Sequence, residues 1–293
     1  MLLAAGETMA MVAPREPERL HAAEVFRVDS GGAESNVAGH VAALGHPSAW
    51  FSRLGADPLG ERILQHLSGR GIDVSTVIRD AAHPTGLYVK DPGHGVHYYR
   101  AGSAASFLCA ADADSVDLDG VGVLHVSGIT AVISPSAAEF LARIMVRARE
   151  AGVPVSFDVN HRPALWDADT AGAALKPFAE GADIVFVGRD EAERLWGAPT
   201  PAAIRALLPD VGELVVKDGA HGATTFAGDD EIFVPALKVD VVEEVGAGDA
   251  FAGGYLAALL DGKTIEERLR AGHARAALVL ATTSDWAEEE EER

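Results

Sequence analysis

The chain has 293 residues, of which 48% are hydrophobic and 31 are glycine, as suits a globular protein with many turns. Its formal net charge of −20 at pH 7 argues against a nucleic acid or an anionic membrane as partner, because no basic segment offsets it. A single cysteine, Cys109, excludes a disulfide within the chain. Residues 1–7 lack the features of a signal peptide, and no apolar run approaches the ~20 residues of a membrane span, so we expect a cytoplasmic protein.

The first segments of the chain predict two strands and a helix. Residues 2–5 are apolar and indicate a buried strand, whereas residues 24–29 alternate like a half-exposed strand. Glycines in residues 31–36 then precede an apolar helix expected over 37–44, with Asn36 near its start. Taken alone, this segment can be only a turn followed by a helix cap.

Residues 85–89 and 95–100 are typical of a β-hairpin. Tyr98 and Arg100 are two residues apart and therefore share a face, which Tyr88 can join from the first arm. An isolated hairpin is marginally stable, so this face needs cover from a ligand, the main domain or a second subunit. The alternative is an exposed hairpin that binds nothing.

The second half of the chain alternates buried strands with helices. Ser134 and Pro135 begin a helix that is expected to run to about residue 150. Continuous apolar strands with helices between them predict a parallel sheet covered on both faces, with ligands at the carboxyl ends of the strands. Residues 158–162 lie at one such end, although they can also be an ordinary polar loop. The apolar runs are 121–126, 153–158, 182–187 and 213–216.

The most informative stretch is Gly246-Ala247-Gly248-Asp249, which follows an apolar run over 233–242 and opens a helix to about residue 260. Backbone N–H groups at such a helix start form an anion site. A carboxylate beside a bound anion is unfavourable, so its presence there indicates a general base. A plain tight turn remains an alternative; a dinucleotide loop would need glycine at Phe251, and a Walker A loop would need glycine at Ala257.

Together with Ala250-Phe251, this stretch resembles the C-terminal signature of the ribokinase-like (PfkB) carbohydrate kinases. Gly31-Gly32 with Asn36 is similar to the N-terminal signature of that family. The resemblance implies one α/β domain over 1–293, with a mostly parallel central sheet, helices on both faces and a small β-sheet lid. The lid would come from about 9–31 and 84–103, and residues 287–293 would form an acidic tail.

The resemblance also implies an enzyme that transfers the γ-phosphoryl group of ATP to a sugar hydroxyl with Mg²⁺. Asp249 would be the base, the N–H groups of Ala247, Gly248 and Asp249 would form the anion hole, and Glu191 would support Mg²⁺ through water. The implied catalytic residues are Asp249 and the turn before it, Gly246, Ala247 and Gly248. The implied nucleotide-binding residues are Lys217, Gly219, Gly222, Gly246 and Gly248. The implied substrate-binding residues are Gly31, Gly32, Asn36, Tyr88, Tyr98, Arg100, Ile129 and Arg162.

The sequence departs from the family pattern at two places. Gly188 stands where the family usually has asparagine, three residues before Glu191. Glu243-Glu244-Val245 replaces a triplet such as Asp-Thr-Thr, so no monovalent-cation site is carried over. These departures leave open a catalytically silent protein that binds nucleotide or sugar.

Residues 6–9, residues 98–104 and Arg162 are similar to 2-keto-3-deoxygluconate kinases. Two arginines, Arg100 and Arg162, suit bidentate recognition of a carboxylate, which favours a sugar acid as substrate. A neutral sugar (fructose, ribose or a nucleoside) is the alternative, in which case the arginines form other pairs. We also expect a homo-oligomer in which the β-sheet lids of two subunits cover each other.

Overall fold

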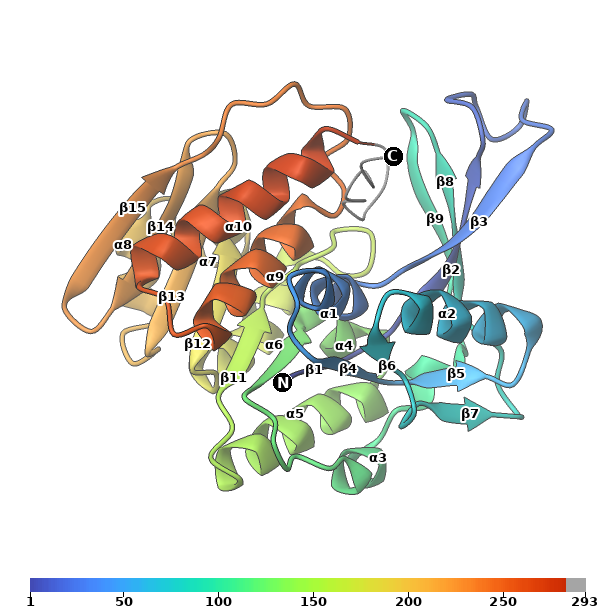
Figure 1. The fold of residues 1–293 in the computed structure, drawn as a ribbon, viewed down its shortest axis with the longest axis horizontal. Coiled ribbons are helices and arrows are strands. Elements are labelled where there is room, and N and C mark those ends of the chain that lie inside the picture. The colour runs from blue at the N-terminus through green and yellow to red at the C-terminus, as the bar shows by residue number, and fades with distance from the viewer. Residues whose placement is uncertain (283–293) are drawn as a thin grey trace.

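The central sheet of the computed structural model, which describes residues 1–282, has nine strands in the order β15-β14-β13-β12-β11-β10-β1-β4-β6 (Figure 1). Neighbours from β6 to β13 are parallel, and β14 and β15 are added antiparallel at one edge. The strands are β1 (Leu2–Ala5), β4 (Ser48–Phe51), β6 (Ile72–Asp73), β10 (Val123–Ser127), β11 (Val155–Asp158), β12 (Ile184–Gly188), β13 (Glu213–Asp218), β14 (Gly222–Ala227) and β15 (Asp230–Pro235).

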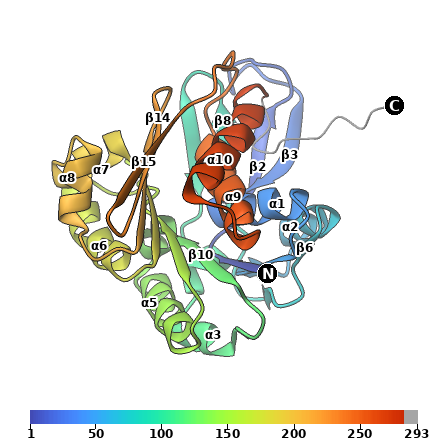
Figure 2. The same cartoon turned by 60° about the vertical axis from the view of Figure 1, so that its left-hand side comes forward.

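Helices cover both faces of this sheet, as the two views in Figures 1 and 2 show. On one face lie α1 (Ala33–Ala43), α2 (Pro58–Gly69), α9 (Ala247–Leu260) and α10 (Ile265–Leu280). On the other lie α3 (Ala110–Ser115), α4 (Gly128–Ile133), α5 (Pro135–Glu150), α6 (Ala168–Glu180), α7 (Arg189–Trp196) and α8 (Pro201–Leu207).

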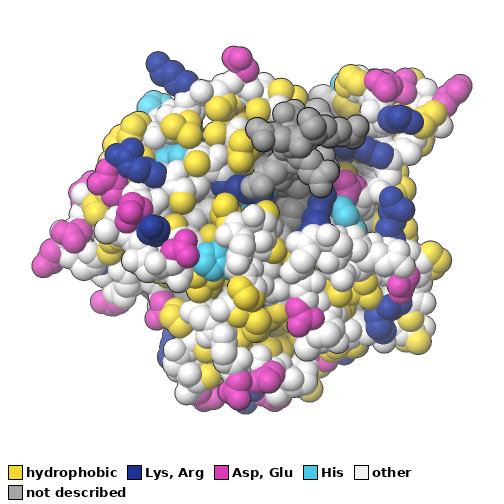
Figure 3. All heavy atoms as spheres, viewed as in Figure 1, with side chains coloured by type: hydrophobic (Ala, Val, Ile, Leu, Met, Phe, Trp, Pro, Cys, Tyr) yellow, Lys and Arg dark blue, Asp and Glu magenta, His cyan; other side chains and the backbone are white. Residues whose placement is uncertain are grey.

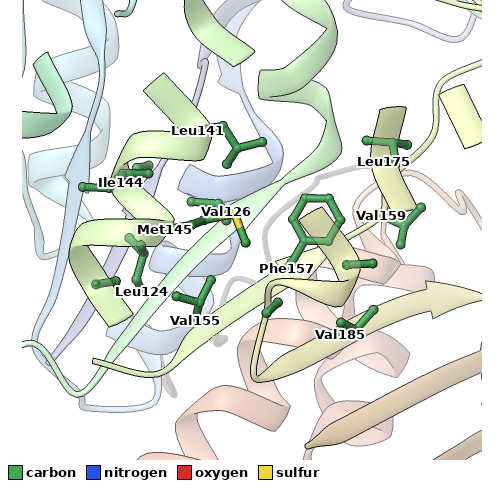
Figure 4. Packing of buried hydrophobic residues seen from close by; sticks show 14 of the residues in the cluster. Leu124, Val126, Leu141, Ile144, Met145, Val155, Phe157, Val159, Leu175 and Val185 are labelled. Carbon is green, nitrogen blue, oxygen red and sulfur yellow. The ribbon is translucent and has the colours of Figure 1, made fainter. Parts of the chain in front are cut away.

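The alternation of side chains along each strand divides the buried hydrophobic residues into two clusters. In β12, Val185 and Val187 join the cluster beneath α5 and α6, whereas Ile184 and Phe186 join the cluster beneath α9. Figure 4 shows the first cluster, where Phe157 and Val185 of the sheet lie near Leu175 of α6. Both faces are therefore apolar, which is the reason for the continuous hydrophobic runs in the sequence.

A separate small sheet has the strand order β3-β2-β8-β9 and stands away from α10 in Figure 1. Its strands are β2 (Met9–Pro14), β3 (Phe26–Gly31), β8 (Leu87–Asp91) and β9 (Gly95–Tyr99), and a further pair joins β5 (Arg53–Gly55) to β7 (Ile78–Asp80). The pairs β2–β3 and β8–β9 are antiparallel, and β2–β8 is parallel. One face of this sheet carries a cluster of Met9, Met11 and Tyr88, with Val96 and Tyr98 packed against it.

The predicted fold class, a mostly parallel sheet with helices on both faces and a small additional sheet, is confirmed. Several element boundaries differ from the expected ones by a few residues, and two of these differences have a clear structural reason. The helix expected from residue 37 begins at Ala33, because Gly32 is extended and serves as its N-cap, so Asn36 lies inside the first turn. The apolar run over 233–242 is a strand only as far as Pro235, because its partner β14 begins at Gly222, which pairs with Pro235. The acidic segment 287–293 lies outside the described residues.

None of the helices in residues 1–282 has the length and hydrophobicity that a membrane span requires. On the face seen in Figure 3, acidic and basic side chains are interspersed. A face of this kind suits the small-molecule ligands that the sequence predicts better than a polyanion.

Candidate active site

The glycine-rich turn starts α9 in the geometry of an anion site. Gly246 is the N-cap with φ of 85°, in the left-handed region that glycine adopts without a steric cost. The Ala247 N–H donates to the Glu244 carbonyl over 3.3 Å. In the described chain, the N–H groups of Gly248 and Asp249 meet no protein acceptor. These two donors and the helix dipole are therefore available to an anion.

Asp249 is a buried carboxyl group in the first turn of this helix. The Asn36 side chain donates a hydrogen bond from Nδ2 to Asp249 Oδ2 over 2.9 Å. Burial raises the pKa of Asp249 to about 7, although Arg162 and the Asn36 hydrogen bond act in the opposite direction. A carboxyl group with a pKa near neutrality is well matched to general-base catalysis at that pH.

Gly31 and Gly32 bring the small sheet close to the start of α1. A Cβ atom at Gly31 would lie 2.1 Å from the hydroxyl oxygen of Tyr88, so any larger residue would displace that tyrosine. A Cβ atom at Gly32 would lie 2.4 Å from the carbonyl oxygen of Glu7. The rings of Tyr88 and Tyr98 pack against each other in a tilted arrangement, with a centroid distance of 6.0 Å. Through Tyr88, the small sheet thus places its aromatic face against the glycines that precede α1.

A polar cavity of about 250 Å³ lies between Asp249 and the carboxyl ends of β11, β12 and β13. Lys217 Nζ donates to Asp158 Oδ2 over 2.8 Å at its wall. Burial opposes the charged form of Lys217, but Asp158 and Glu191 outweigh burial and raise the pKa of Lys217. The lysine therefore stays protonated and can meet an anionic ligand. The cavity lining includes Asp158, Asn160, Arg162, Glu191, Lys217, Gly246, Gly248 and Asp249.

Arg162 lines the same cavity as Asp249. Within residues 1–282, its guanidinium group forms no ion pair, although its charge acts on Asp249. Arg100, in contrast, forms an ion pair between Nη2 and Glu7 Oε2. Ile129 lies at the start of α4, where its N–H donates to Ser127 Oγ over 3.2 Å. Of the two arginines expected to recognise a carboxylate, one is available and the other already has an acidic partner.

Glu191 closes the first turn of α7. Its carboxylate accepts hydrogen bonds from the N–H groups of Gly188, over 3.0 Å, and His161. Burial and the charge of Asp158 raise the pKa of Glu191. In the described chain, no group of three or more His, Cys, Asp or Glu side chains is arranged to hold a metal ion. The few carboxylates here fit Mg²⁺, which is usually held by one or two carboxylates together with phosphate oxygens and water.

A second, mostly apolar cavity of about 560 Å³ adjoins the polar one. Its walls come from the turn between β13 and β14, the loop after β15, α9 and α10. They include Gly219, Gly222, Leu237, Val241, Phe251, His273, Ala276 and Leu280. Lys217 and Gly248 line both cavities. A ligand with a flat apolar end and an anionic end can therefore span the two, as a nucleoside triphosphate would.

Residues 1–291 match the family model for pfkB family carbohydrate kinases. The chain belongs to the PfkB family of carbohydrate kinases.

Among curated relatives of this PfkB-family kinase, the 2-dehydro-3-deoxygluconokinase of Bacillus subtilis (strain 168) is 39% identical over 289 residues, covering 96% of this chain and 89% of the relative. A PfkB protein from Polaromonas sp. JS666 has a similar crystal structure, with a TM-score of 0.88, 35% identity and coverage of 96% and 95% of the two chains. The 2-dehydro-3-deoxygluconokinase of Thermotoga maritima has a TM-score of 0.87 at 26% identity, with coverage of 97% and 94%.

Some residues around this PfkB-family site were not predicted as functional. Glu34 is fully buried and accepts hydrogen bonds from Ser127 Oγ, over 2.6 Å, and Thr130 Oγ1, over 3.2 Å. Burial raises the pKa of Glu34. Glu7 is likewise buried beside the small sheet. The signal in the sequence was an acidic residue close behind a buried strand, in the case of Glu7, and at the start of an apolar helix, in the case of Glu34.

Proposed function

We propose that this sugar kinase phosphorylates 2-keto-3-deoxygluconate or a related sugar acid, with ATP as phosphoryl donor. The observation that carries the proposal is Arg162, a guanidinium group that forms no ion pair in the described chain and lines the same cavity as Asp249. Such a group suits the carboxylate of a substrate whose hydroxyl lies near the base. The names of the relatives from Bacillus subtilis and Thermotoga maritima support the same substrate.

In the mechanism we propose, Asp249 accepts the proton of the substrate hydroxyl as its oxygen attacks the γ-phosphorus in line with the leaving group. Asn36 orients the Asp249 carboxylate through their 2.9 Å hydrogen bond. The free N–H groups of Gly248 and Asp249 and the ammonium group of Lys217 stabilise negative charge on the transferring group. Glu191 and Asp158 would hold Mg²⁺, and the ion would supply positive charge against the phosphate oxygens.

The nucleotide is proposed to occupy the apolar cavity, with its base between the β13–β14 turn and α10 and its phosphates toward Gly248. Gly219 and Gly222 lie in the first wall, and His273 lies in the second. The His273 ring hydrogen-bonds the carbonyl oxygen of Val234 over 3.0 Å, so we assign it a packing role. We further propose a cytoplasmic enzyme, where ATP is available, and a homo-oligomer formed through the small sheet.

A neutral sugar is a second candidate substrate, and the ion pair between Arg100 and Glu7 favours it, because the Glu7 carboxylate offsets the positive charge of one of the two arginines. ADP release with Mg-ATP distinguishes the two, measured across 2-keto-3-deoxygluconate, gluconate, fructose, ribose and adenosine. We expect turnover with the keto-deoxy acid and little with the neutral sugars. Turnover confined to a neutral sugar would overturn the carboxylate assignment. Ligand-induced stabilisation without ADP would instead indicate a silent binder.

A further inference from the structure

Glu7 occupies the junction between the two sheets. It lies between β1 of the central sheet and β2 of the small sheet, and it is 3% exposed. The chain returns from the small sheet at the end of β9, through residues 100–103, to the short helix at Ala104–Phe107. The outgoing and returning connections therefore meet at this carboxylate.

Both oxygens of Glu7 bind this returning segment. Oε2 forms the ion pair with Arg100 Nη2, and Oε1 accepts a hydrogen bond from Ser103 Oγ over 2.6 Å. The backbone closes the same turn, because the Ser103 N–H donates to the Arg100 carbonyl over 3.0 Å. Glu7 thus holds the first and last residues of a four-residue turn that leads out of β9.

The Arg100 side chain is mostly buried, with 11% of its surface exposed. Its guanidinium lies 5.8 Å from the ring centroid of Tyr98, on the aromatic face of the small sheet. Its buried Nε has no hydrogen-bond partner within residues 1–282. A buried N–H donor without a partner is costly, so it indicates a polar ligand group that is bound during function.

We propose that Glu7 is a positioning residue for recognition of an acidic sugar: it fixes the Arg100 guanidinium so that its remaining donors face the substrate carboxylate. This inference rests on the proposed sugar-acid substrate. A carboxylate in this role offsets the charge of a buried arginine and fixes its direction at the same time. Glu7 itself does not need to touch the substrate. A purely structural role, in which Glu7 only ties the two sheets together, is the competing explanation.

A double-mutant cycle separates these roles. The variants are Glu7→Ala, Arg100→Ala and the double variant, assayed on 2-keto-3-deoxygluconate and on its neutral carboxamide. Because Glu7→Ala releases Arg100, we expect it to raise KM for the acid about tenfold and to change kcat by less than about threefold. KM for the amide should change little. When Arg100 is already alanine, adding Glu7→Ala is expected to change KM for the acid by less than about twofold.

The matched control is Glu180→Ala, which breaks the exposed pair between Lys176 and Glu180 on α6 and should leave both KM values unchanged. If Glu7→Ala is too unstable to assay, Glu7→Gln retains the side-chain shape and enters the same cycle. Additive losses, or equal losses on the acid and the amide, would overturn the positioning role. Failure of the wild-type enzyme to phosphorylate the acid would instead overturn the proposed function, and this inference with it.

Discussion

At the scale of single residues, the ionisation of Asp249 controls the proposed chemistry. Its pKa of about 7 means that the carboxyl group loses its proton near neutral pH. Only the unprotonated form can accept a proton, so we predict that kcat/KM falls about tenfold per pH unit below about 7 and levels off above it. Initial rates between pH 5 and 9 with saturating Mg-ATP provide the measurement. A flat profile down to pH 5 would contradict this assignment.

Arg162 gives the second prediction at this scale. We expect Arg162→Ala to raise KM for 2-keto-3-deoxygluconate by roughly 10–100-fold, because a hydrogen bond to a charged group contributes about 1.5–3 kcal/mol. Arg162→Lys should recover only part of this loss, since an ammonium group cannot bind a carboxylate in two parallel bonds. Steady-state kinetics of both variants test the prediction. An unchanged KM in Arg162→Ala would exclude this arginine from substrate recognition.

At the scale of elements, the start of α9 depends on the backbone of Gly246. We predict that Gly246→Ala lowers kcat by about 10²–10³-fold, because a left-handed residue with a Cβ atom is strained and the N–H donors of the first turn would move. Gly71 is a matched control, with φ of 79° and no atom near its added Cβ. Gly71→Ala should lower the free energy of unfolding by about as much as Gly246→Ala does, but it should keep full activity. Equal kcat values for the two variants would show that catalysis does not depend on the left-handed backbone at residue 246.

The sequence was sufficient to predict the glycine turn, the buried strands and most helix boundaries, because these depend on local patterns. It was not sufficient to predict contacts between distant segments. Asn36 and Asp249 are 213 positions apart, and only the fold brings them into a hydrogen bond. Likewise, Arg100 was expected to face a substrate carboxylate, but nothing local to it shows that Glu7 would be its partner.

The replaced triplet at 243–245 is another case in which distance along the chain hid a contact. Lys90 in β8 donates from Nζ to Glu243 Oε1 over 2.9 Å, which joins the small sheet to the loop that leads into the anion turn. The sequence indicated only that Glu243 differs from the family pattern. An ion pair between residues 153 positions apart depends on the arrangement of the two sheets.

At the scale of the whole molecule, the outer face of the small sheet is the candidate interface between copies. Strand register places Phe26, Val28, Val89, Leu87 and Tyr99 on this face, opposite the aromatic cluster. Phe26 and Tyr99 are 40% and 63% exposed. Large exposed apolar side chains in one patch are typical of an interaction surface.

We predict a homodimer by light scattering, and a shift toward monomer in Tyr99→Glu, because a carboxylate buried in an apolar interface would be desolvated without a partner. Glu231→Ala, an exposed position on β15 remote from this sheet, is the control. A monomeric mass for the wild-type protein would contradict the interface.

The measurement that tests the account most directly is ADP release by Asp249→Asn. The variant retains the shape of the side chain and can still accept the Asn36 hydrogen bond, but it cannot accept a proton. We predict a 10²–10⁴-fold lower kcat with little change in ATP affinity.

Because the folded state raises the pKa of Asp249, the charged carboxyl destabilises the wild-type fold increasingly as pH rises from about 4 to about 7. The variant should therefore be at least as stable as wild type at pH 8, so that inactivity cannot be due to unfolding. A kcat within tenfold of wild type would contradict the assignment of Asp249 as the base.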